Sequence, residues 1–178
     1  MSNTFDKYIK IIENVLTYDE CNKLIQLSNN HNYQIINETT RLNQRIIIDD
    51  EIFTNNLLKK LNSYIPKIYN NMTFNSINPR LRFLKYTKGD YFERHKDNSY
   101  YNNGKISLIT ILIYLNDNYN GGFTKFFTNI DDADGQTIYP KVGMVCLADQ
   151  QIGHEVPPLI DGIKYVIRTE LMYKSNVL

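Results

Sequence analysis

The chain has 178 residues, of which 42% are hydrophobic and 22% charged, and its formal net charge is +1. This length allows one compact domain with a sizeable core, and the balance of apolar and charged residues excludes a disordered chain. A net charge this small gives no general affinity for acidic partners. No repeat, low-complexity tract or flexible linker interrupts the sequence, so we predict a single domain over residues 1–178.

Two cysteines, Cys21 and Cys146, lie far apart in the sequence, and neither belongs to a cysteine or histidine cluster. A secreted domain of this size usually carries more cysteines in pairs, so we predict two buried thiols in a reducing compartment. The N-terminal segment has no apolar signal core, and no apolar stretch approaches the length of about 18 residues that a membrane span needs. We therefore expect a soluble, cytoplasmic protein with no signal peptide and no membrane partner.

Helical patterns mark the N-terminal part of the chain. Thr17 followed by Glu20 forms a capping-box pattern, and apolar residues recur at helical spacing after it. A second helix is expected to begin near Asp49 or Asp50. These patterns predict that residues 1–76 form a helical support.

The pattern changes to strands after about residue 77. Four segments are rich in β-branched, aromatic and aliphatic residues: RLRFLKY (80–86), ISLITILIYL (106–115), VGMVCLA (142–148) and IKYVIRTELMY (163–173). Turn-forming residues separate them. We predict a mainly β, α+β fold in which residues 77–178 form an antiparallel barrel or sandwich behind the N-terminal helices.

A candidate metal site begins with His95 and Asp97. Residues i and i+2 of an extended strand point to the same face, so both side chains can converge on one ion. The third ligand of a two-histidine, one-carboxylate iron site comes from elsewhere, and the other histidines are His31 and His154. His31 lies in a polar stretch at a helix end, whereas His154 follows an apolar strand. Each signal alone is weak, because His-x-Asp is a common tripeptide.

The last predicted strand alternates between an apolar face and a face that carries charges. The charged face includes Lys164, Arg168 and Glu170, and such a face often lies in water. Lys164 nevertheless follows His154 by ten residues. A buried cation there would pair strongly with the carboxylate of an acidic co-substrate.

The segment from Arg80 to Tyr173 resembles the catalytic domain of the prolyl 4-hydroxylase-like 2-oxoglutarate/Fe(II)-dependent oxygenases. The matching segments follow in this order: RLRFLKYTKGDYFERHKD, LITILIYLND, GGFTKFF, GHEVPP and GIKY. Together they span about half of the chain, and their order and spacing make the resemblance specific.

This resemblance implies a double-stranded β-helix, also called a jelly-roll or cupin-like core. It implies that the cofactors are Fe(II), 2-oxoglutarate as co-substrate and O₂, with ascorbate as the reductant. It assigns the iron ligands and catalytic residues to His95, Asp97 and His154. It assigns the distal (C5) carboxylate of 2-oxoglutarate to Lys164, and the lining of the co-substrate pocket to Tyr86, Tyr114 and Thr124.

One departure concerns the residues beyond the lysine. Collagen-type prolyl hydroxylases carry a tryptophan there, whereas this chain has Arg168-Thr169-Glu170 and no tryptophan at all. Arg168 shares a strand face with Lys164, so we expect it to reach the C1 carboxylate of 2-oxoglutarate or the substrate. The departure argues against a collagen-like substrate.

The resemblance favours hydroxylation of a protein side chain, most simply peptidyl proline, with release of succinate and CO₂. The polar segment 97–104, which contains Tyr100 and Tyr101, is suited to form a lid over a peptide substrate. The alternatives are hydroxylation of a free amino acid or other small molecule, and a non-catalytic metal-binding β-sandwich or sensor. Nucleic-acid demethylation has little support, because the basic residues near the metal motif belong to a chain of low net charge.

Overall fold

The structure of the protein is a computed structural model that describes residues 4–175. The helices are η1 (Thr4–Lys7), α1 (Tyr18–Asn29) and α2 (Glu51–Leu61). The strands are β1 (Ile9–Ile12), β2 (Gln34–Glu38), β3 (Arg41–Asp49), β4 (Ile68–Tyr69), β5 (Met72–Ile77), β6 (Arg80–Tyr86), β7 (Tyr91–His95), β8 (Tyr101–Asn102), β9 (Lys105–Tyr114), β10 (Asn120–Gly121), β11 (Thr124–Phe127), β12 (Gln136–Ile138), β13 (Val145–Asp149), β14 (Gly153–Val156), β15 (Leu159–Asp161) and β16 (Lys164–Ser175).

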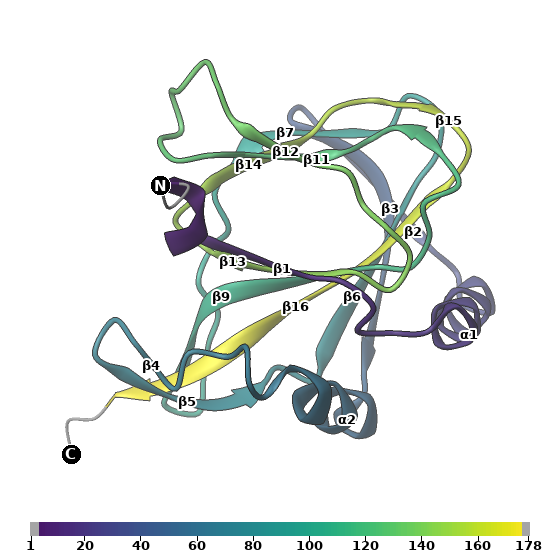
Figure 1. The fold of residues 1–178 in the computed structure, drawn as a ribbon. Helices are drawn as coiled ribbons and strands as arrows, with labels where there is room; N and C mark the ends of the chain where they lie inside the picture. The colour runs from purple at the N-terminus through teal and green to yellow at the C-terminus, as the bar shows by residue number, and fades with distance from the viewer. Residues whose placement is uncertain (1–3, 176–178) are drawn as a thin grey trace.

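Most strands belong to one large antiparallel sheet in the order β1-β13-β9-β16-β6-β3-β7-β14-β11-β12. The sheet curls back on itself, so that β7, β14, β11 and β12 form a second layer facing β13, β9 and β16 (Figure 1). The long strands β9 and β16 pair from Tyr114 opposite Val166 to Lys105 opposite Lys174. This arrangement confirms the predicted mainly β class and agrees with a jelly-roll core.

The two α-helices pack on the outer face of the large layer (Figure 1). Leu57 and Leu61 of α2 belong to one buried apolar cluster with Ile111 of β9 and Ile167 of β16. Since side chains alternate along a strand, the residues between these apolar ones face the interior of the curled sheet. The hydrophobic effect on one face therefore directs the polar residues of the same strands inward.

The prediction that residues 1–76 form a helical support is wrong in part. The helices are present, with Thr17 capping α1 and the Asp50 side chain accepting a hydrogen bond at the start of α2. The same region also contributes β1, which pairs with β13, and β3, which lies between β6 and β7. Strand β3 begins Arg-Leu-Asn-Gln-Arg, and these polar residues concealed its two-residue alternation.

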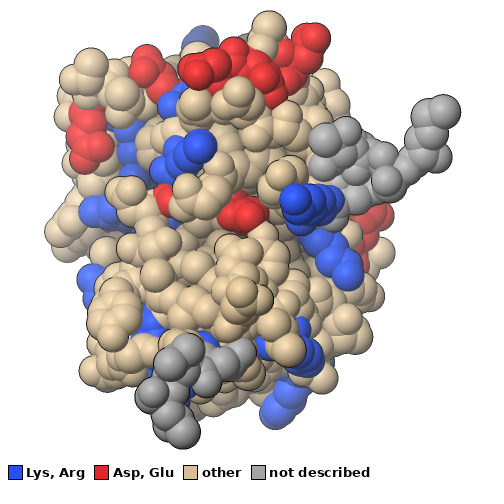
Figure 2. All heavy atoms as spheres, turned by 90° about the vertical axis from the view of Figure 1, so that its left-hand side faces the viewer, with Lys and Arg blue, Asp and Glu red and all other residues tan. Residues whose placement is uncertain are grey.

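Charge is unevenly distributed on the molecular surface. On the face in Figure 2, acidic side chains gather along the upper edge, and lysine and arginine side chains are dispersed over the rest. This face therefore has no continuous basic surface. None of the described helices combines the length and apolar character of a membrane span. Cys21 and Cys146 are both buried free thiols.

Candidate active site

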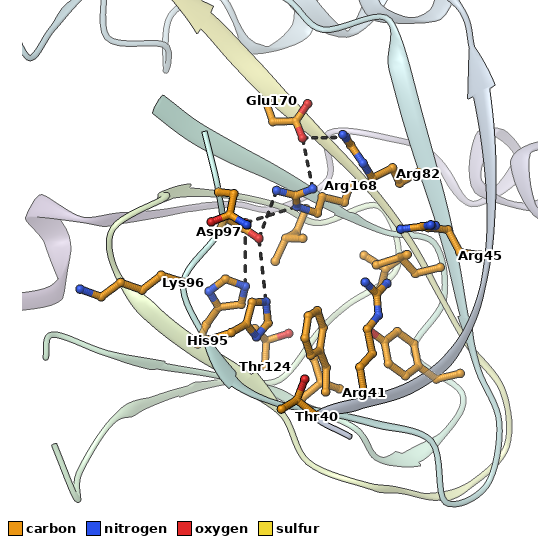
Figure 3. A pocket seen from close by; sticks show the side chains of 18 of the residues that line it. Thr40, Arg41, Arg45, Arg82, His95, Lys96, Asp97, Thr124, Arg168 and Glu170 are labelled. Atoms are coloured by element: carbon orange, nitrogen blue, oxygen red, sulfur yellow. Dashed lines mark hydrogen bonds and ion pairs between the residues drawn. The ribbon is translucent and has the colours of Figure 1, made fainter. Parts of the chain in front are cut away.

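A cavity of about 470 Å³ lies inside the curled sheet. Side chains from β3, β6, β7, β9, β14 and β16 line it (Figure 3). Its volume falls in the usual range for a small-molecule or cofactor site. Of the eight site residues predicted from the sequence, all line this cavity: Tyr86, His95, Asp97, Tyr114, Thr124, His154, Lys164 and Arg168.

The pairing of β7 with β14 brings the two histidines together. His95 lies directly opposite His154 in the register of these strands, and their ring centroids are 4.2 Å apart. Asp97 follows two residues after the end of β7, so the expectation that His95 and Asp97 share an extended strand is wrong. The backbone leaves the strand after His95, and the Asp97 amide donates to the Gln150 carbonyl at 3.2 Å. The three side chains still present ligand atoms within 4.8 Å of one another.

Both histidines present Nε2 to the carboxylate. His95 Nε2 lies 3.9 Å from Asp97 Oδ1, and His154 Nε2 lies 3.9 Å from Asp97 Oδ2. His95 Nδ1 lies 2.8 Å from the Glu93 carbonyl, which favours the tautomer with the proton on Nδ1 and a free lone pair on Nε2. Burial, together with the neighbouring His154, lowers the pKa of His95 to about 4. The imidazole is therefore neutral at physiological pH, as a metal ligand must be.

Asp97 is buried yet remains ionised. Its Oδ2 accepts a hydrogen bond from Thr110 Oγ1 at 2.5 Å, and its Oδ1 lies 3.1 Å from Arg168 Nη2. Burial raises the pKa of the carboxyl, but Arg168, the histidines and Thr110 together hold it at about 2. The carboxylate is thus available to a cation near neutral pH.

This donor set fits a divalent iron ion. Two neutral imidazoles and one carboxylate are the ligands of non-haem iron sites that keep coordination positions open, whereas structural zinc sites are usually closed by four ligands. No other group of three His, Cys, Asp or Glu side chains converges in this way in residues 4–175. His31 is exposed and borders a different depression, beside Gln34 and Ile47.

Lys164 lies in the same cavity and is 1% exposed. Its Nζ donates to the Gly122 carbonyl at 2.6 Å, and no carboxylate pairs with it in the described part of the chain. Burial lowers its pKa to about 7. Nearby, Tyr114 donates to Thr124 Oγ1 at 2.9 Å. A buried ammonium without a counter-ion, beside hydroxyl groups, is a suitable environment for a carboxylate of a bound ligand.

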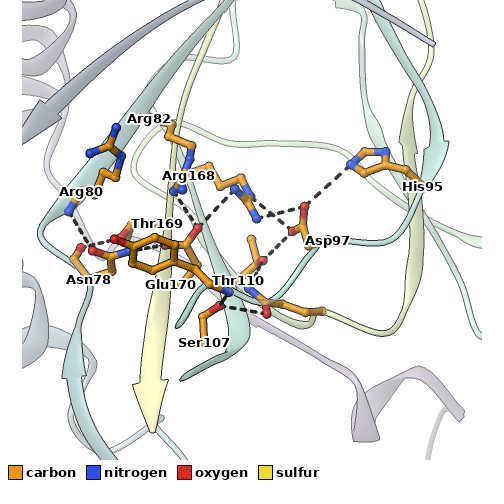
Figure 4. Close-up of polar contacts among 12 residues, drawn as sticks. Asn78, Arg80, Arg82, His95, Asp97, Ser107, Thr110, Arg168, Thr169 and Glu170 are labelled. Atoms are coloured by element: carbon orange, nitrogen blue, oxygen red, sulfur yellow. Dashed lines mark hydrogen bonds and ion pairs between the residues drawn. The ribbon is translucent and has the colours of Figure 1, made fainter. Parts of the chain in front are cut away.

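A chain of ion pairs connects Asp97 to β6 (Figure 4). Arg168 Nη1 lies 3.2 Å from Glu170 Oε1, which also accepts from Arg82 Nη1 at 2.7 Å. Asn78 Nδ2 donates to the other oxygen of Glu170 at 2.7 Å. In this structure Arg168 pairs with Asp97 and Glu170, whereas we predicted that it faces the co-substrate or substrate. The structural role of Glu170 and Arg82 was missed, because only the pairing of β6 with β16 brings them together.

Strands β3 and β7 supply further cavity residues that we did not predict from the sequence. The Phe92 ring stacks on the His95 ring with centroids 3.5 Å apart. The Phe92 ring also contacts Arg41, whose guanidinium lies 4.5 Å from the ring centroid. Arg45 lines the cavity from the same strand. The spacing of Arg41 and Arg45 was a signal in the sequence, because residues four apart on a strand point to the same face.

The predicted lid segment, residues 97–104, ends in a short hairpin between β8 and β9. Tyr101 belongs to β8, which pairs with β9, and its side chain is exposed. Tyr100 lines the cavity, as do Asn98 and Ser99. The segment therefore borders the cavity, and closure over a substrate stays a prediction.

Solved structures show the same fold. A prolyl-4-hydroxylase from Pseudomonas putida aligns with 97% of this chain and 95% of its own, at 16% identity and a TM-score of 0.68. A prolyl hydroxylase from Trichoplax adhaerens, solved with a hypoxia inducible factor peptide fragment, aligns over 95% and 86% at 20% identity and a TM-score of 0.71. HygX from Streptomyces hygroscopicus, solved with nickel, 2-oxoglutarate and hygromycin B, aligns over 98% and 86% at 14% identity and a TM-score of 0.66.

The curled sheet and the cluster of two histidines and one carboxylate define a non-haem iron oxygenase. The sequence profile of the 2OG-Fe(II) oxygenase superfamily matches residues 81–169, which is half of the chain. The chain belongs to this superfamily and is an oxidoreductase that resembles the prolyl 4-hydroxylases. No curated protein sequence gives a match.

Proposed function

We propose that the protein is an Fe(II)- and 2-oxoglutarate-dependent hydroxylase whose iron ligands are His95, Asp97 and His154. The observation that carries this proposal is the convergence of these three side chains in a cavity that also contains the buried, unpaired Lys164. We assign the distal carboxylate of 2-oxoglutarate to Lys164. Fe(II), 2-oxoglutarate and O₂ supply the oxidising chemistry when bound, with succinate and CO₂ as products and ascorbate as the external reductant.

The chain's own residues prepare the site in four ways. Arg168 and Thr110 keep Asp97 ionised and oriented, while the Glu93 carbonyl sets the His95 tautomer. Tyr86, Tyr114 and Thr124 line the cavity around Lys164 and offer hydroxyl groups to the co-substrate. The enclosed position of Lys164 excludes water from the ion pair that it would form, which strengthens the attraction.

For the substrate we propose a peptidyl side chain, with proline as the first choice. The resemblance to prolyl 4-hydroxylases supports this choice, and one of the structural neighbours was solved with a peptide. The segment at residues 97–104 borders the cavity, and we propose that an extended peptide lies along it.

A free amino acid or other small polar molecule is the second candidate. It is favoured by the buried Glu170, which lies with its arginine partners in the segment where collagen-type enzymes have a tryptophan. Charged groups on a cavity wall suit a polar ligand better than the apolar ring of proline.

The direct test is turnover by the purified protein with Fe(II), 2-oxoglutarate and ascorbate, measured as succinate formation. Proline peptides and free amino acids are offered in parallel, and mass spectrometry locates any added oxygen. We expect His154→Ala and Asp97→Ala to reduce succinate formation to background, while His31→Ala retains it because His31 lies outside the cavity. Loss of turnover in His31→Ala with retention in His154→Ala would show that the ligand assignment is wrong.

A further inference from the structure

The cavity wall has an excess of positive charge. Its basic residues are Arg41, Arg45, Arg82, Lys96, Lys164 and Arg168, and its acidic residues are Glu38, Asp97 and Glu170. Six cations against three carboxylates leave three positive charges in excess, although the whole chain has a net charge of only +1. A divalent iron and the dianion of 2-oxoglutarate cancel each other, so binding of both leaves this excess unchanged.

Most of these cations already have a function in the site. Arg168 pairs with Asp97 and Glu170, and Arg82 pairs with Glu170. Lys164 is assigned to 2-oxoglutarate. Lys96 is exposed and points away from the centre of the cavity in Figure 3. Arg41 and Arg45 therefore remain to be explained.

Arg41 and Arg45 extend from β3 into the cavity (Figure 3). Neither forms an ion pair with any described carboxylate, including the exposed Glu38 on the same rim. Burial lowers the pKa of Arg41, the guanidiniums of Arg45 and Arg168 act in the same direction, and Tyr86 and the Glu38 carboxylate oppose them. Like charges that repel each other in a partly buried wall are unfavourable until an anion binds there.

Arg41 is also held in a fixed orientation. Its Nε donates to Asn43 Oδ1 at 3.0 Å, and its guanidinium lies over the Phe92 ring, which stacks on His95. The two terminal amino groups of Arg41 are left for a ligand. An anion held there would lie one aromatic ring away from His95, a proposed iron ligand.

We infer that Arg41 and Arg45 form a carboxylate-binding subsite for the substrate that is hydroxylated. This inference rests on the proposed function and specifies its substrate class: the acceptor carries a carboxylate close to the carbon that reacts. The carboxylate has two possible sources, an Asp or Glu side chain near the target residue of a peptide, or the α-carboxylate of a free amino acid.

Binding experiments can test the subsite independently of turnover. The whole protein, loaded with Mn(II) and 2-oxoglutarate, is titrated with proline-centred peptide pairs that differ only by Asp or Asn at one position. A second arm compares free amino acids with their carboxamides. We expect one arm to show binding of the acid about 10- to 100-fold tighter than binding of the amide, as for loss of a charge-assisted hydrogen bond.

Variants identify the residues responsible. Arg41→Gln and Arg45→Gln should abolish the preference for the acid, while Arg45→Lys should retain most of it because the charge remains. The matched control Arg80→Gln removes the same charge from β6 outside the cavity, where Arg80 lies 4.0 Å from Asp49, and it should retain the full preference. The KM for 2-oxoglutarate should stay unchanged in all of these variants.

Equal binding of acid and amide in both arms would overturn the inference. So would an Arg45→Gln variant whose KM for 2-oxoglutarate rises, because the arginines would then serve the co-substrate. Iron-dependent succinate formation without any acceptor reports on the proposed function alone. If succinate forms but the acid and the amide bind equally, the carboxylate subsite is rejected and the proposed hydroxylase function is retained.

Discussion

At the scale of single residues, Lys164 shows how a binding site opposes stability. An ammonium group that is 1% exposed and lacks a counter-ion costs free energy in the ligand-free protein. In the proposed site, binding of a co-substrate carboxylate offsets this cost. The residue to which we assign the co-substrate therefore destabilises the ligand-free protein.

We predict that Lys164→Met stabilises the ligand-free protein by about 1–4 kcal/mol while abolishing 2-oxoglutarate binding. The gain depends on pH. The pKa of Lys164 falls from 10.5 to about 7 on folding, so between these values the unfolded chain binds more protons, and the wild-type protein becomes more stable as pH rises. The difference in unfolding free energy between Lys164→Met and the wild type should thus be largest below pH 7 and disappear above about pH 10.5. Urea unfolding of both proteins across this range measures the difference.

A variant that is less stable than the wild type at pH 6 would contradict this account. It would mean that the methylene stem of Lys164 contributes more by packing than its ammonium group costs. Lys85→Met serves as the control, because Lys85 is only partly buried and lies outside the cavity.

At the scale of elements, the positions of the strands depend on close contacts at turns. Gly143 precedes β13 with a φ of +74°, and a Cβ placed there would lie 2.0 Å from the Leu16 carbonyl oxygen. The Gly143 carbonyl accepts from the Val15 and Leu16 amides, so the turn attaches the segment before α1 to the sheet. Only glycine satisfies both the backbone conformation and the contact.

Gly143→Ala should therefore lower the free energy of unfolding by well over the roughly 1–2 kcal/mol that a left-handed conformation alone costs. Gly104→Ala is a matched control, since Gly104 has a φ of +71° and no atom within 4 Å of the added Cβ. Chemical unfolding of both variants separates the steric contribution from the conformational one. Equal losses would show that the Leu16 contact relaxes at no cost.

At the scale of the whole molecule, the site joins the two layers of the curled sheet. His95 and His154 lie on β7 and β14 of one layer, whereas Lys164 and Arg168 lie on β16 of the other. A metal ion and a co-substrate that contact both layers should stabilise the folded protein through binding to the native state alone.

We predict that Mn(II) with 2-oxoglutarate raises the Tm of the wild-type protein and that EDTA reverses the increase. At ligand concentrations about 100-fold above Kd, the expected stabilisation is about 2.7 kcal/mol. His95→Ala should lose the increase with Mn(II), and Lys164→Met should lose the part that depends on 2-oxoglutarate. A full increase in His95→Ala would place the metal elsewhere in the chain.

Local patterns carried much of the information about this protein. Two-residue alternation and turn residues predicted the mainly β class, since both depend on backbone geometry that neighbouring residues determine. The order of the motifs from Arg80 to Tyr173 indicated the family, and all eight predicted site residues line one cavity. The roles assigned to them remain predictions.

Only the tertiary structure decided which groups meet. Arg41 and Arg45 lie more than fifty residues before Asp97 in the sequence, and they enter the cavity because β3 lies between β6 and β7. Glu170 pairs with Arg82 because β6 and β16 are neighbours. Burial and pairing of charges depend on long-range strand order, and the residues adjacent in the sequence do not encode that order. The sequence by itself thus determined the class of chemistry, while the folded sheet determined the charge of the cavity.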